Sequence, residues 1–215
     1  MLNIHSIEVN PIQENCYIVS DESNECVIID CGALYDNEKE SVKNYIEINK
    51  LKPIHLLNTH LHFDHVWGND FIYSTYGLLT EASDRDKDIY NDVPGQIEQL
   101  IGHKWKYPFY APMGKALTEN DIVKFGTHEL KVIATPGHTP GGICFYCEIE
   151  KVLFSGDSLF YCSIGRTDFP GGNQRELIEN LKTKITTLPE NTIVYPGHGP
   201  ATNIGTEIRF NPYLT

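Results

Sequence analysis

The sequence has few basic residues for its size. It contains 17 Lys and Arg against 29 Asp and Glu, which gives a formal charge of −12. Sequence-independent binding to nucleic acid needs clustered Lys and Arg that replace phosphate counterions, and the longest basic cluster is Lys104–Trp105–Lys106. We interpret this cluster as surface, and we predict no nucleic-acid partner.

Long hydrophobic runs are also absent. No apolar segment reaches the roughly 18 residues that a bilayer-spanning helix needs. The first ten residues, MLNIHSIEVN, lack the basic and apolar regions of a secretory signal. We therefore expect no membrane partner and a cytoplasmic location, where the six cysteines would be reduced thiols.

Two of these cysteines, Cys144 and Cys147, form a C-x-x-C pair without a second pair at comparable spacing. A zinc ribbon needs that second pair, and a redox pair usually opens a helix, whereas this segment has the pattern of a strand. Free cysteine usually packs as a small apolar residue. We predict two buried strand cysteines rather than a redox or metal site.

The order of the predicted elements indicates an α/β fold built from two similar halves. The 215 residues suffice for one good-sized core, and we expect a single domain over residues 1–215. Segments 15–32 and 141–160 each have two apolar runs around a turn, the pattern of a β-hairpin. Apolar residues at helical spacing predict helices over 36–50 and 171–188, and a shorter one over 95–101. Further buried strands are expected in 53–60, 129–138 and 191–199.

The first of these further strands leads into a segment rich in histidine, NTHLHFDHVWGND, residues 58–70. Residues i and i+2 of an extended chain point the same way, so His60 and His62 can bind one ion together. Asp64 and His65 follow a change of direction and can bind a second ion. A solvated polar loop is the alternative, but these side chains crowd the end of a buried strand with no predicted helix to spread them. The pattern therefore favours a metal site.

Three more residues of ligand type lie in loops that follow predicted strands. His138 and His198 lie in Gly- and Pro-rich turns, which hold a side chain in a fixed orientation, and Asp157 follows the second hairpin. Either histidine alone would indicate only a turn. The histidine-rich segment makes them candidate partners in the same site. The remaining histidines are expected to be structural or surface residues: His5, His55, His103 and His128.

The run THLHFDH, followed by His138, Asp157 and His198 at growing separations, resembles the metallo-β-lactamase-fold hydrolases over nearly the whole chain. The resemblance implies a four-layer αββα sandwich with a two-metal centre at one edge of its two sheets. It also implies a specific set of ligands: His60, His62 and His138 for the first ion, Asp64, His65 and His198 for the second, and Asp157 as a bridge.

Such a centre is suited to hydrolysis. Two divalent ions about 3.5–4 Å apart can share a water and lower its pKa to near neutrality. Asp64 would bind its ion through one oxygen and orient this nucleophile with the other, which makes it the candidate catalytic residue. Two divalent ions less two carboxylates and one hydroxide leave a charge of about +1, which favours an anionic substrate. Mixed nitrogen and oxygen ligands suit zinc, which we expect, or iron or manganese.

Asp30, at the end of the first hairpin, is predicted to anchor the histidine-rich segment from behind through hydrogen bonds. A plain turn cap is the alternative for this residue.

Two further segments narrow the resemblance. GRTDFPGG, residues 165–172, and GHGPATNIGTEIRFNPYL, residues 197–214, resemble compact bacterial glyoxalase II-like hydrolases, which cleave thioesters of glutathione. Asp157 argues against a true β-lactamase of this fold. Arg166 falls where the family has a basic residue that contacts the thiol portion of the substrate; a salt bridge to Asp168 is the alternative. No helical glutathione-binding domain is expected after His198.

The sequence therefore predicts a dinuclear hydrolase of a small-molecule thioester, of the 2-hydroxyacyl-glutathione type. The alternative is a mononuclear Fe(II) persulfide dioxygenase, which shares the GRTDF loop, and a lactonase is the third choice. A protein that only binds a partner fits least, because no ligand of the family is missing.

Overall fold

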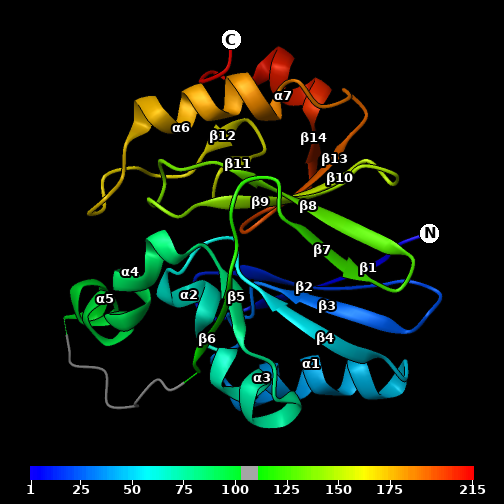
Figure 1. Ribbon diagram of the computed structural model, residues 1–215. Coiled ribbons are helices and arrows are strands. Elements are labelled where there is room, and N and C mark those ends of the chain that lie inside the picture. The colour runs from blue at the N-terminus through cyan, green and yellow to red at the C-terminus, as the bar shows by residue number, and fades with distance from the viewer. Residues whose placement is uncertain (103–110) are drawn as a thin grey trace.

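Two six-stranded β-sheets lie face to face between two layers of helices (Figure 1). Helices α6 and α7 cover one sheet, and α1 and α3 cover the other, so the predicted four-layer αββα sandwich is confirmed. The computed structural model describes residues 1–102 and 111–215. The expectations for His103 and for the cluster Lys104–Trp105–Lys106 lie outside the described residues.

The first sheet has the strand order β1-β2-β3-β4-β5-β6. Its strands are β1 (Asn3–Val9), β2 (Glu14–Ser20), β3 (Glu25–Ile29), β4 (Lys52–Leu57), β5 (Thr80–Ala82) and β6 (Met113–Ala116). The helices of this half are α1 (Asp36–Ile48), α2 (Phe63–Val66), α3 (Asn69–Tyr76), α4 (Lys87–Asn91) and α5 (Val93–Ile101), with a 3₁₀ turn at Asp84–Asp86.

The second sheet has the order β14-β13-β10-β9-β8-β7. Its strands are β7 (Ile122–Phe125), β8 (His128–Ala134), β9 (Ile143–Cys147), β10 (Val152–Gly156), β13 (Ile193–Pro196) and β14 (Thr202–Asn203). A small ladder joins β11 (Leu159–Phe160) to β12 (Ser163–Ile164). Helix α6 (Gln174–Asn180) continues into a π-helical turn (Leu181–Ile185), and α7 (Ile204–Phe210) follows β14.

The alternation of side chains along the strands explains the layers. Successive residues of a strand point to opposite faces of the sheet. In β2, Tyr17 and Val19 face the core between the two sheets, whereas Cys16 and Ile18 face the core shared with α1 and α3. Each sheet therefore has apolar residues on both faces, so one face packs against the other sheet and the opposite face packs against helices.

The same alternation settles the C-x-x-C pair. Both cysteines lie on β9 and are fully buried, as predicted. Cys147 packs between the sheets, whereas Cys144 packs under α6, on the other face of the same sheet. Two thiols on opposite faces of a sheet cannot act together on one ion or one substrate.

The predicted hairpins are confirmed as β2–β3 and β9–β10, both antiparallel. The predicted helices are confirmed as α1, α5 and α6, and the Asn173 side chain accepts a hydrogen bond from the Glu176 N–H at the start of α6. Each of the three further strands is shorter than its predicted segment and ends before the ligand-type residues: β4, β8 and β13. The ligand-type residues therefore lie on loops that leave the sheets.

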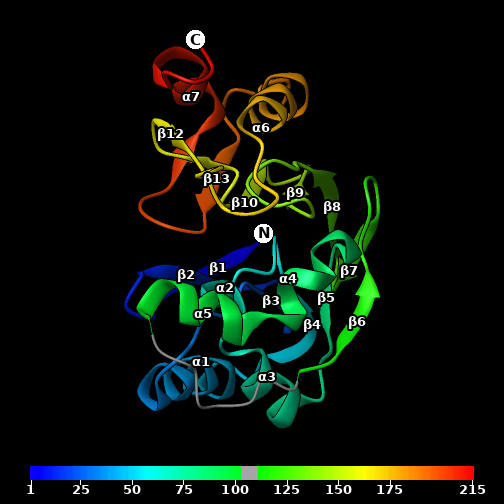
Figure 2. The ribbon, with the colours of Figure 1, turned by 90° about the vertical axis from the view of Figure 1, so that its left-hand side faces the viewer.

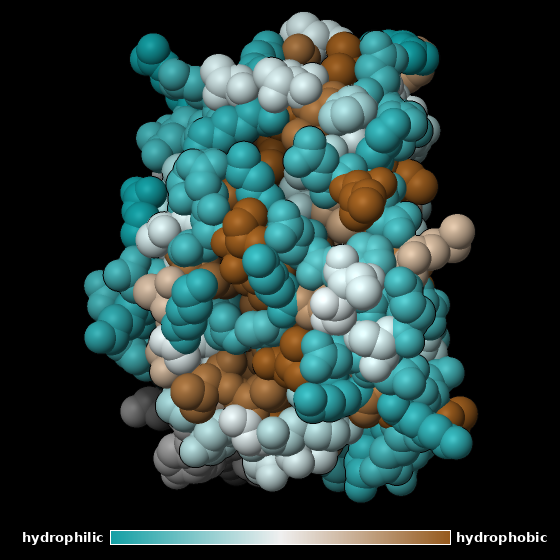
Figure 3. All heavy atoms as spheres, turned by 45° about the vertical axis from the view of Figure 1, so that its right-hand side comes forward, coloured by the Kyte–Doolittle hydropathy of each residue, from teal (hydrophilic) through white to brown (hydrophobic). Residues whose placement is uncertain are grey.

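The surface in Figure 3 is largely hydrophilic, and hydrophobic side chains appear on this face in several separate groups. Scattered apolar side chains are normal for a folded protein. Within residues 1–102 and 111–215, no helix combines the length and the apolar character that crossing a bilayer requires.

Candidate metal centre

The candidate ligands meet at one edge of the sandwich, between the ends of the two sheets. Figure 2 looks onto this edge, where α2, α4 and α5 lie beside the first sheet and the segment between β12 and α6 comes from the second. Strand β4 leads to His60 and His62, β8 to His138, β10 to Asp157 and β13 to His198. The two halves of the chain therefore bring these candidate ligands together in one place.

The histidine-rich segment contains a short helix that the sequence analysis did not predict. His62 has extended backbone angles, φ −66° and ψ 149°, and it occupies the N-cap position of α2, which carries Asp64 and His65. The expectation that no helix spreads these residues is therefore wrong. The helix start produces the predicted change of direction: His60 and His62 lie on extended chain, and Asp64 and His65 lie on the first turn of α2.

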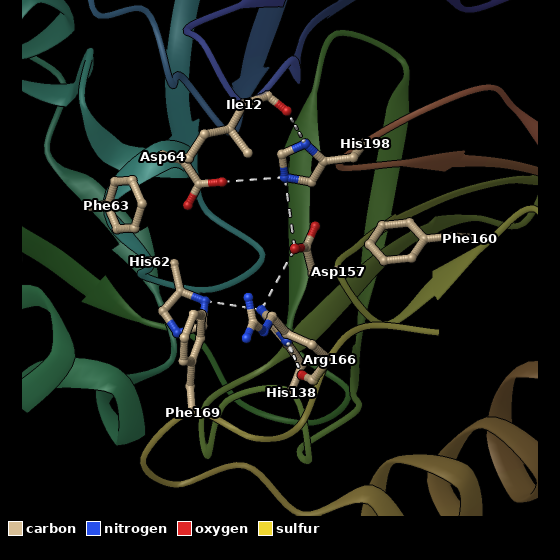
Figure 4. Close-up of a pocket in the computed structure, with 10 residues that line it drawn as sticks. All are labelled: Ile12, His62, Phe63, Asp64, His138, Asp157, Phe160, Arg166, Phe169 and His198. Carbon is tan, nitrogen blue, oxygen red and sulfur yellow. Dashed lines mark hydrogen bonds and ion pairs between the residues drawn. The ribbon is translucent and has the colours of Figure 1, made fainter. Parts of the chain in front are cut away.

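Three histidines form the first group of ligand atoms, which we call the three-histidine group: His60, His62 and His138. One nitrogen of each lies within 4.8 Å of the other two. His62 Nδ1 and His138 Nε2 are 2.9 Å apart (Figure 4). His138 Nδ1 donates a hydrogen bond of 2.6 Å to the Arg166 carbonyl, which orients its other nitrogen toward the group.

A second group, which we call the Asp64 group, consists of Asp64, His65 and His198. Asp64 Oδ2 lies 3.2 Å from His198 Nε2 and 3.8 Å from His65 Nε2. His198 Nδ1 donates to the Ile12 carbonyl at 3.1 Å, and this contact directs Nε2 toward Asp64 (Figure 4).

Asp157 lies between the two groups. Its Oδ1 is 3.4 Å from His65 Nε2, and its Oδ2 is 3.6 Å from His138 Nε2 and 3.7 Å from His198 Nε2. Ligand atoms about 2.0–2.1 Å from a tetrahedral zinc ion are about 3.3–3.4 Å from one another. The observed separations are close to this spacing, so one carboxylate is placed to contact an ion in either group.

Buried polar atoms without partners provide a test of whether these residues fit metal ions. His60 Nε2, His65 Nε2 and Asp157 Oδ1 are buried and accept or donate no hydrogen bond within the described part of the chain. Such atoms cost free energy unless they are satisfied. Their convergence on the two groups fits divalent ions bound by nitrogen and oxygen.

The electrostatics of the site agree with this fit. Burial, helped by neighbouring histidines, lowers the pKa of His62 to about 3 and lowers the pKa of His60 as well. Both rings are therefore neutral and have lone pairs to offer. Burial alone would raise the pKa of Asp157, but the adjacent His65 holds it below the usual range, so this carboxylate is ionised. His60, His62 and Asp157 are thus in the protonation states that metal ligation needs. Burial alone would lower the pKa values of His65 and His198, but the carboxylates around these two rings raise both values, so that each ring would release its proton on binding an ion.

Asp30 lies directly behind the ligands, where the sequence analysis expected an anchor. Its Oδ1 accepts a hydrogen bond of 2.8 Å from the Thr59 N–H, and its Oδ2 accepts one of 2.6 Å from the Thr59 hydroxyl. The same Oδ2 lies 3.1 Å from His65 Nδ1. Asp30 therefore contacts both ends of the segment from Thr59 to His65.

Two buried carboxylates beside the candidate ligands were not predicted from the sequence: Glu14 and Asp86. Glu14 of β2 accepts a hydrogen bond of 3.1 Å from the Gly32 N–H, and its other oxygen lies 4.0 Å from His65 Nδ1. Burial raises the pKa of Glu14 well above its usual value. Asp86, in the 3₁₀ turn, is also fully buried. Asp86 belongs to the charged run SDRDKD, which looks like solvated surface, and Glu14 has no local signal.

A cavity of about 380 Å³ opens over the two groups. Its walls beyond the ligands are mostly apolar, and they are formed by Ile12, Phe63, Phe160, Phe169 and Arg166 (Figure 4). Arg166 forms two hydrogen bonds with Asp168, at 2.8 and 2.7 Å, and its guanidinium lies 4.0 Å from the centre of the Phe169 ring. Arg166 thus lines the cavity, as a substrate contact would require, and it also forms the salt bridge to Asp168 that was the alternative prediction for it.

Comparison with known proteins places these observations in a family. The family model described as the metallo-beta-lactamase superfamily matches residues 9–198. The hydroxyacylglutathione hydrolase GloC of Haemophilus influenzae is 35% identical, over 99% of this chain and 98% of its own length. The probable metallo-hydrolase YqgX of Bacillus subtilis is also 35% identical, over 96% and 94%.

Solved structures of similar fold include a metallo-beta-lactamase and a protein with bound iron. The crystal structure of the BLEG-1 B3 metallo-beta-lactamase has a TM-score of 0.88 and 36% identity, and the match covers 100% of both chains. TTHA1623, solved in a di-iron-bound form, has a TM-score of 0.85 and 34% identity, over 98% of this chain and 100% of its own.

Proposed function

Because the chain belongs to the metallo-β-lactamase superfamily, we propose that it is a dinuclear metal-dependent hydrolase that cleaves an acyl thioester, of the 2-hydroxyacyl-glutathione type. The observation that carries this proposal is the place of Asp157 between the three-histidine group and the Asp64 group. A carboxylate in that place can bridge two ions. The similarity to a relative named hydroxyacylglutathione hydrolase supports the class of substrate.

Each residue has a proposed role. The three-histidine group would hold one ion, the Asp64 group the other, and Asp157 both. The histidines and carboxylates suit zinc, iron or manganese, and a relative of similar fold binds two iron ions. Asp30 would hold His65 in orientation through the contact with Nδ1, as outer partners of metal-binding histidines generally do.

The hydrolysis is derived from the side chains that surround the cavity. Two divalent ions at these ligands would lower the pKa of a shared water and polarise the substrate carbonyl. Asp64 directs Oδ2 toward His198, which leaves its second oxygen to accept a proton from the attacking water. The water oxygen would bond to the carbonyl carbon, and the C–S bond would break as the carbonyl re-forms. The leaving sulfur would take the proton from Asp64, which gives a thiol and a carboxylic acid that ionises in water.

The cavity walls support a thioester with one apolar portion and one anionic portion. Phe160 and Ile12 lie on the His198 side, and Phe63 and Phe169 lie on the His62 side (Figure 4). Arg166 is more than half exposed at the cavity, where its guanidinium can exchange Asp168 for a substrate carboxylate. We propose Arg166 as the substrate anchor.

A substrate panel tests the proposal. The metal-loaded protein should release thiol from S-D-lactoylglutathione with a kcat/KM well above the values for the lactone and β-lactam members of the panel, and it should consume no oxygen with glutathione persulfide. Oxygen uptake on the persulfide, with one iron per chain, would instead identify a dioxygenase. Preferential opening of a lactone would identify a lactonase.

Hydrolysis of β-lactams is the second candidate function. The specific observation in its favour is the similarity to BLEG-1, which is titled a B3 metallo-beta-lactamase and matches over the full length of both chains. The panel therefore includes a penicillin and a cephalosporin. Faster hydrolysis of either than of the thioester would make this second function the correct one.

A further inference from the structure

Asp86 links the two loops that carry the three-histidine group. Its Oδ2 accepts a hydrogen bond of 3.3 Å from the Leu61 N–H, between His60 and His62. The same carboxylate accepts one of 2.7 Å from the Thr139 hydroxyl and one of 2.6 Å from the Gly141 N–H, in the loop that carries His138. A single buried side chain thus contacts the backbone of one ligand loop and two donors of the other.

The surroundings of Asp86 are built for this contact. The side chain is fully buried, as is Thr139. A Cβ atom at position 141 would lie only 2.6 Å from Asp86 Cγ, so the glycine allows the carboxylate to come this close. A buried carboxylate costs free energy unless its oxygens are satisfied, and here three donors from two loops satisfy them.

The arrangement is specific to one of the two groups. The hydrogen bonds of Asp86 go to the residue between His60 and His62 and to the residues that follow His138. The Asp64 group is held by other contacts: Asp30 beside His65 Nδ1, the Ile12 carbonyl on His198 Nδ1, and the Asn10 side chain, which donates to the Asp64 carbonyl at 2.9 Å. Asp30 also accepts a hydrogen bond from the Thr59 hydroxyl, which lies 3.1 Å from His60 Nδ1, so Asp30 is linked to both groups. The hydrogen bonds of Asp86 within the described residues, in contrast, reach the three-histidine group alone.

We propose that Asp86 is a positioning residue that fixes the spacing of the three-histidine group and thereby sets the affinity of that group for its metal ion, independently of the Asp64 group. The inference rests on the proposed dinuclear centre. Loss of Asp86 would let the His138 loop move relative to the segment with His60 and His62. The distance between His62 Nδ1 and His138 Nε2, which is 2.9 Å in the structure, would then no longer be fixed.

Two variants and two matched controls test this inference. Asp86→Asn keeps the size of the side chain but removes its charge, and Thr139→Val removes one donor without changing the volume. Asp84→Asn removes a charge from an exposed position of the same 3₁₀ turn, and Thr139→Ser keeps the hydroxyl. The measurement is a zinc titration of the metal-free proteins in competition with a chromophoric chelator, which resolves each equivalent without reference to turnover.

We expect wild type and both controls to bind two equivalents of zinc. Each equivalent should bind a control variant with the same affinity as it binds wild type. In Asp86→Asn and in Thr139→Val, one equivalent should bind about 10–100-fold more weakly, the usual effect of losing an outer partner, while the other is unchanged. In a His62→Ala background, which lacks the three-histidine group, Asp86→Asn should have no further effect on the remaining equivalent.

Three results would overturn the inference. Equal weakening of both equivalents would mean that Asp86 supports the fold in general, and unchanged affinities would mean that it has no positioning role. Either result, with two equivalents in wild type, leaves the proposed function intact. Fewer than two equivalents in wild type would overturn the dinuclear centre itself, and the inference with it. Unfolding midpoints of all variants, measured without metal, separate affinity changes from misfolding.

Discussion

At the residue scale, the proposed function gives Asp64 two tasks that usually belong to different side chains. Its Oδ2 lies with His198 and His65 in the Asp64 group, and in the proposal its other oxygen would accept a proton from the attacking water. Burial would raise the pKa of this carboxyl, but His65 and a hydrogen bond from His198 hold it below the usual value, so Asp64 is ionised and can accept a proton. Turnover should therefore depend on it strongly.

We expect Asp64→Asn to lower kcat by about 10²–10⁴-fold, the usual contribution of a positioned general base. The amide keeps one oxygen toward the histidines but cannot take a proton. The measurement is kcat on the thioester, with metal content and circular dichroism as controls. Activity within about threefold of wild type would show that Asp64 has neither role.

Arg166 gives a second test at this scale. If it anchors a substrate carboxylate, Arg166→Ala should raise KM by about 5–30-fold, equivalent to about 1–2 kcal/mol, and change kcat little. Arg209, paired with Glu190 and similarly exposed, lies on α7 and is the matched control: Arg209→Ala should leave both constants unchanged. Equal KM values for wild type and Arg166→Ala would limit Arg166 to its salt bridge with Asp168.

Most of the residues that the sequence predicted lie within a few positions of the end of an apolar strand with a clear pattern: β3, β4, β8, β10 or β13. His138 and Asp157 could be recognised as candidate site residues because each is a polar residue that follows a buried apolar segment. Asp86 and Glu14 have no such mark. Asp86 is buried by contacts with residues more than fifty positions away, such as Thr139, and no local pattern encodes a contact of that kind.

At the scale of elements, short links between strands hold the ligand loops in register. His55 on β4 is hydrogen-bonded to Glu81 on β5 at 2.5 Å, next to the strand end that leads to His60. This bond raises the pKa of His55 above its usual value, against the effect of burial. A raised pKa in the folded state means that protonated His55 stabilises the fold at low pH.

The pH dependence follows from that sign. The stabilisation by the His55–Glu81 pair should be fully present below about pH 6.5 and lost as the pH rises through the folded-state pKa. The difference in unfolding free energy between wild type and Glu81→Gln should thus be larger at about pH 5.5 than at about pH 9, by less than about 1 kcal/mol. The control is Glu47→Gln, which removes a carboxylate that pairs with a lysine, Lys43, and not with a histidine. A difference that grows with pH would contradict the assignment.

Elements with a strong pattern were predictable, and those without one were not. The hairpins β2–β3 and β9–β10 have continuous apolar runs around polar turns, and α1 and α6 have helical spacing. Around the nine-residue helix α5, which its spacing did predict, the strands β5 and β6 have three and four residues and the helix α4 has five, too few to establish a period. Helix α2 was missed because its four residues are mostly ligands and aromatic side chains, chosen for contacts at the site rather than for helix formation.

At the scale of the whole molecule, the site joins two sheets that otherwise meet through an apolar core. The first sheet supplies His60, His62, Asp64 and His65, and the second supplies His138, Asp157 and His198. Ions bound to both sets would connect the halves. Because ions bound only to the folded state stabilise it by mass action, metal removal should destabilise the protein.

We expect chelation to lower the melting temperature by about 5–10 °C, which corresponds to a metal concentration about 100 times the dissociation constant. Zinc or manganese should restore both the melting temperature and the activity. The measurement is a thermal scan of loaded, stripped and reloaded protein, with magnesium as the control ion, because magnesium prefers oxygen ligands. An unchanged melting temperature on stripping would contradict a metal centre shared by the two sheets.

The most direct test of the central claim is the rate of thioester hydrolysis as metal-free protein is titrated with zinc. A dinuclear centre bridged by Asp157 predicts that the rate continues to rise to two equivalents per chain and then reaches a plateau. The Asp157→Ala variant should show little hydrolysis at any metal concentration. A plateau at one equivalent, or full activity in Asp157→Ala, would contradict the account.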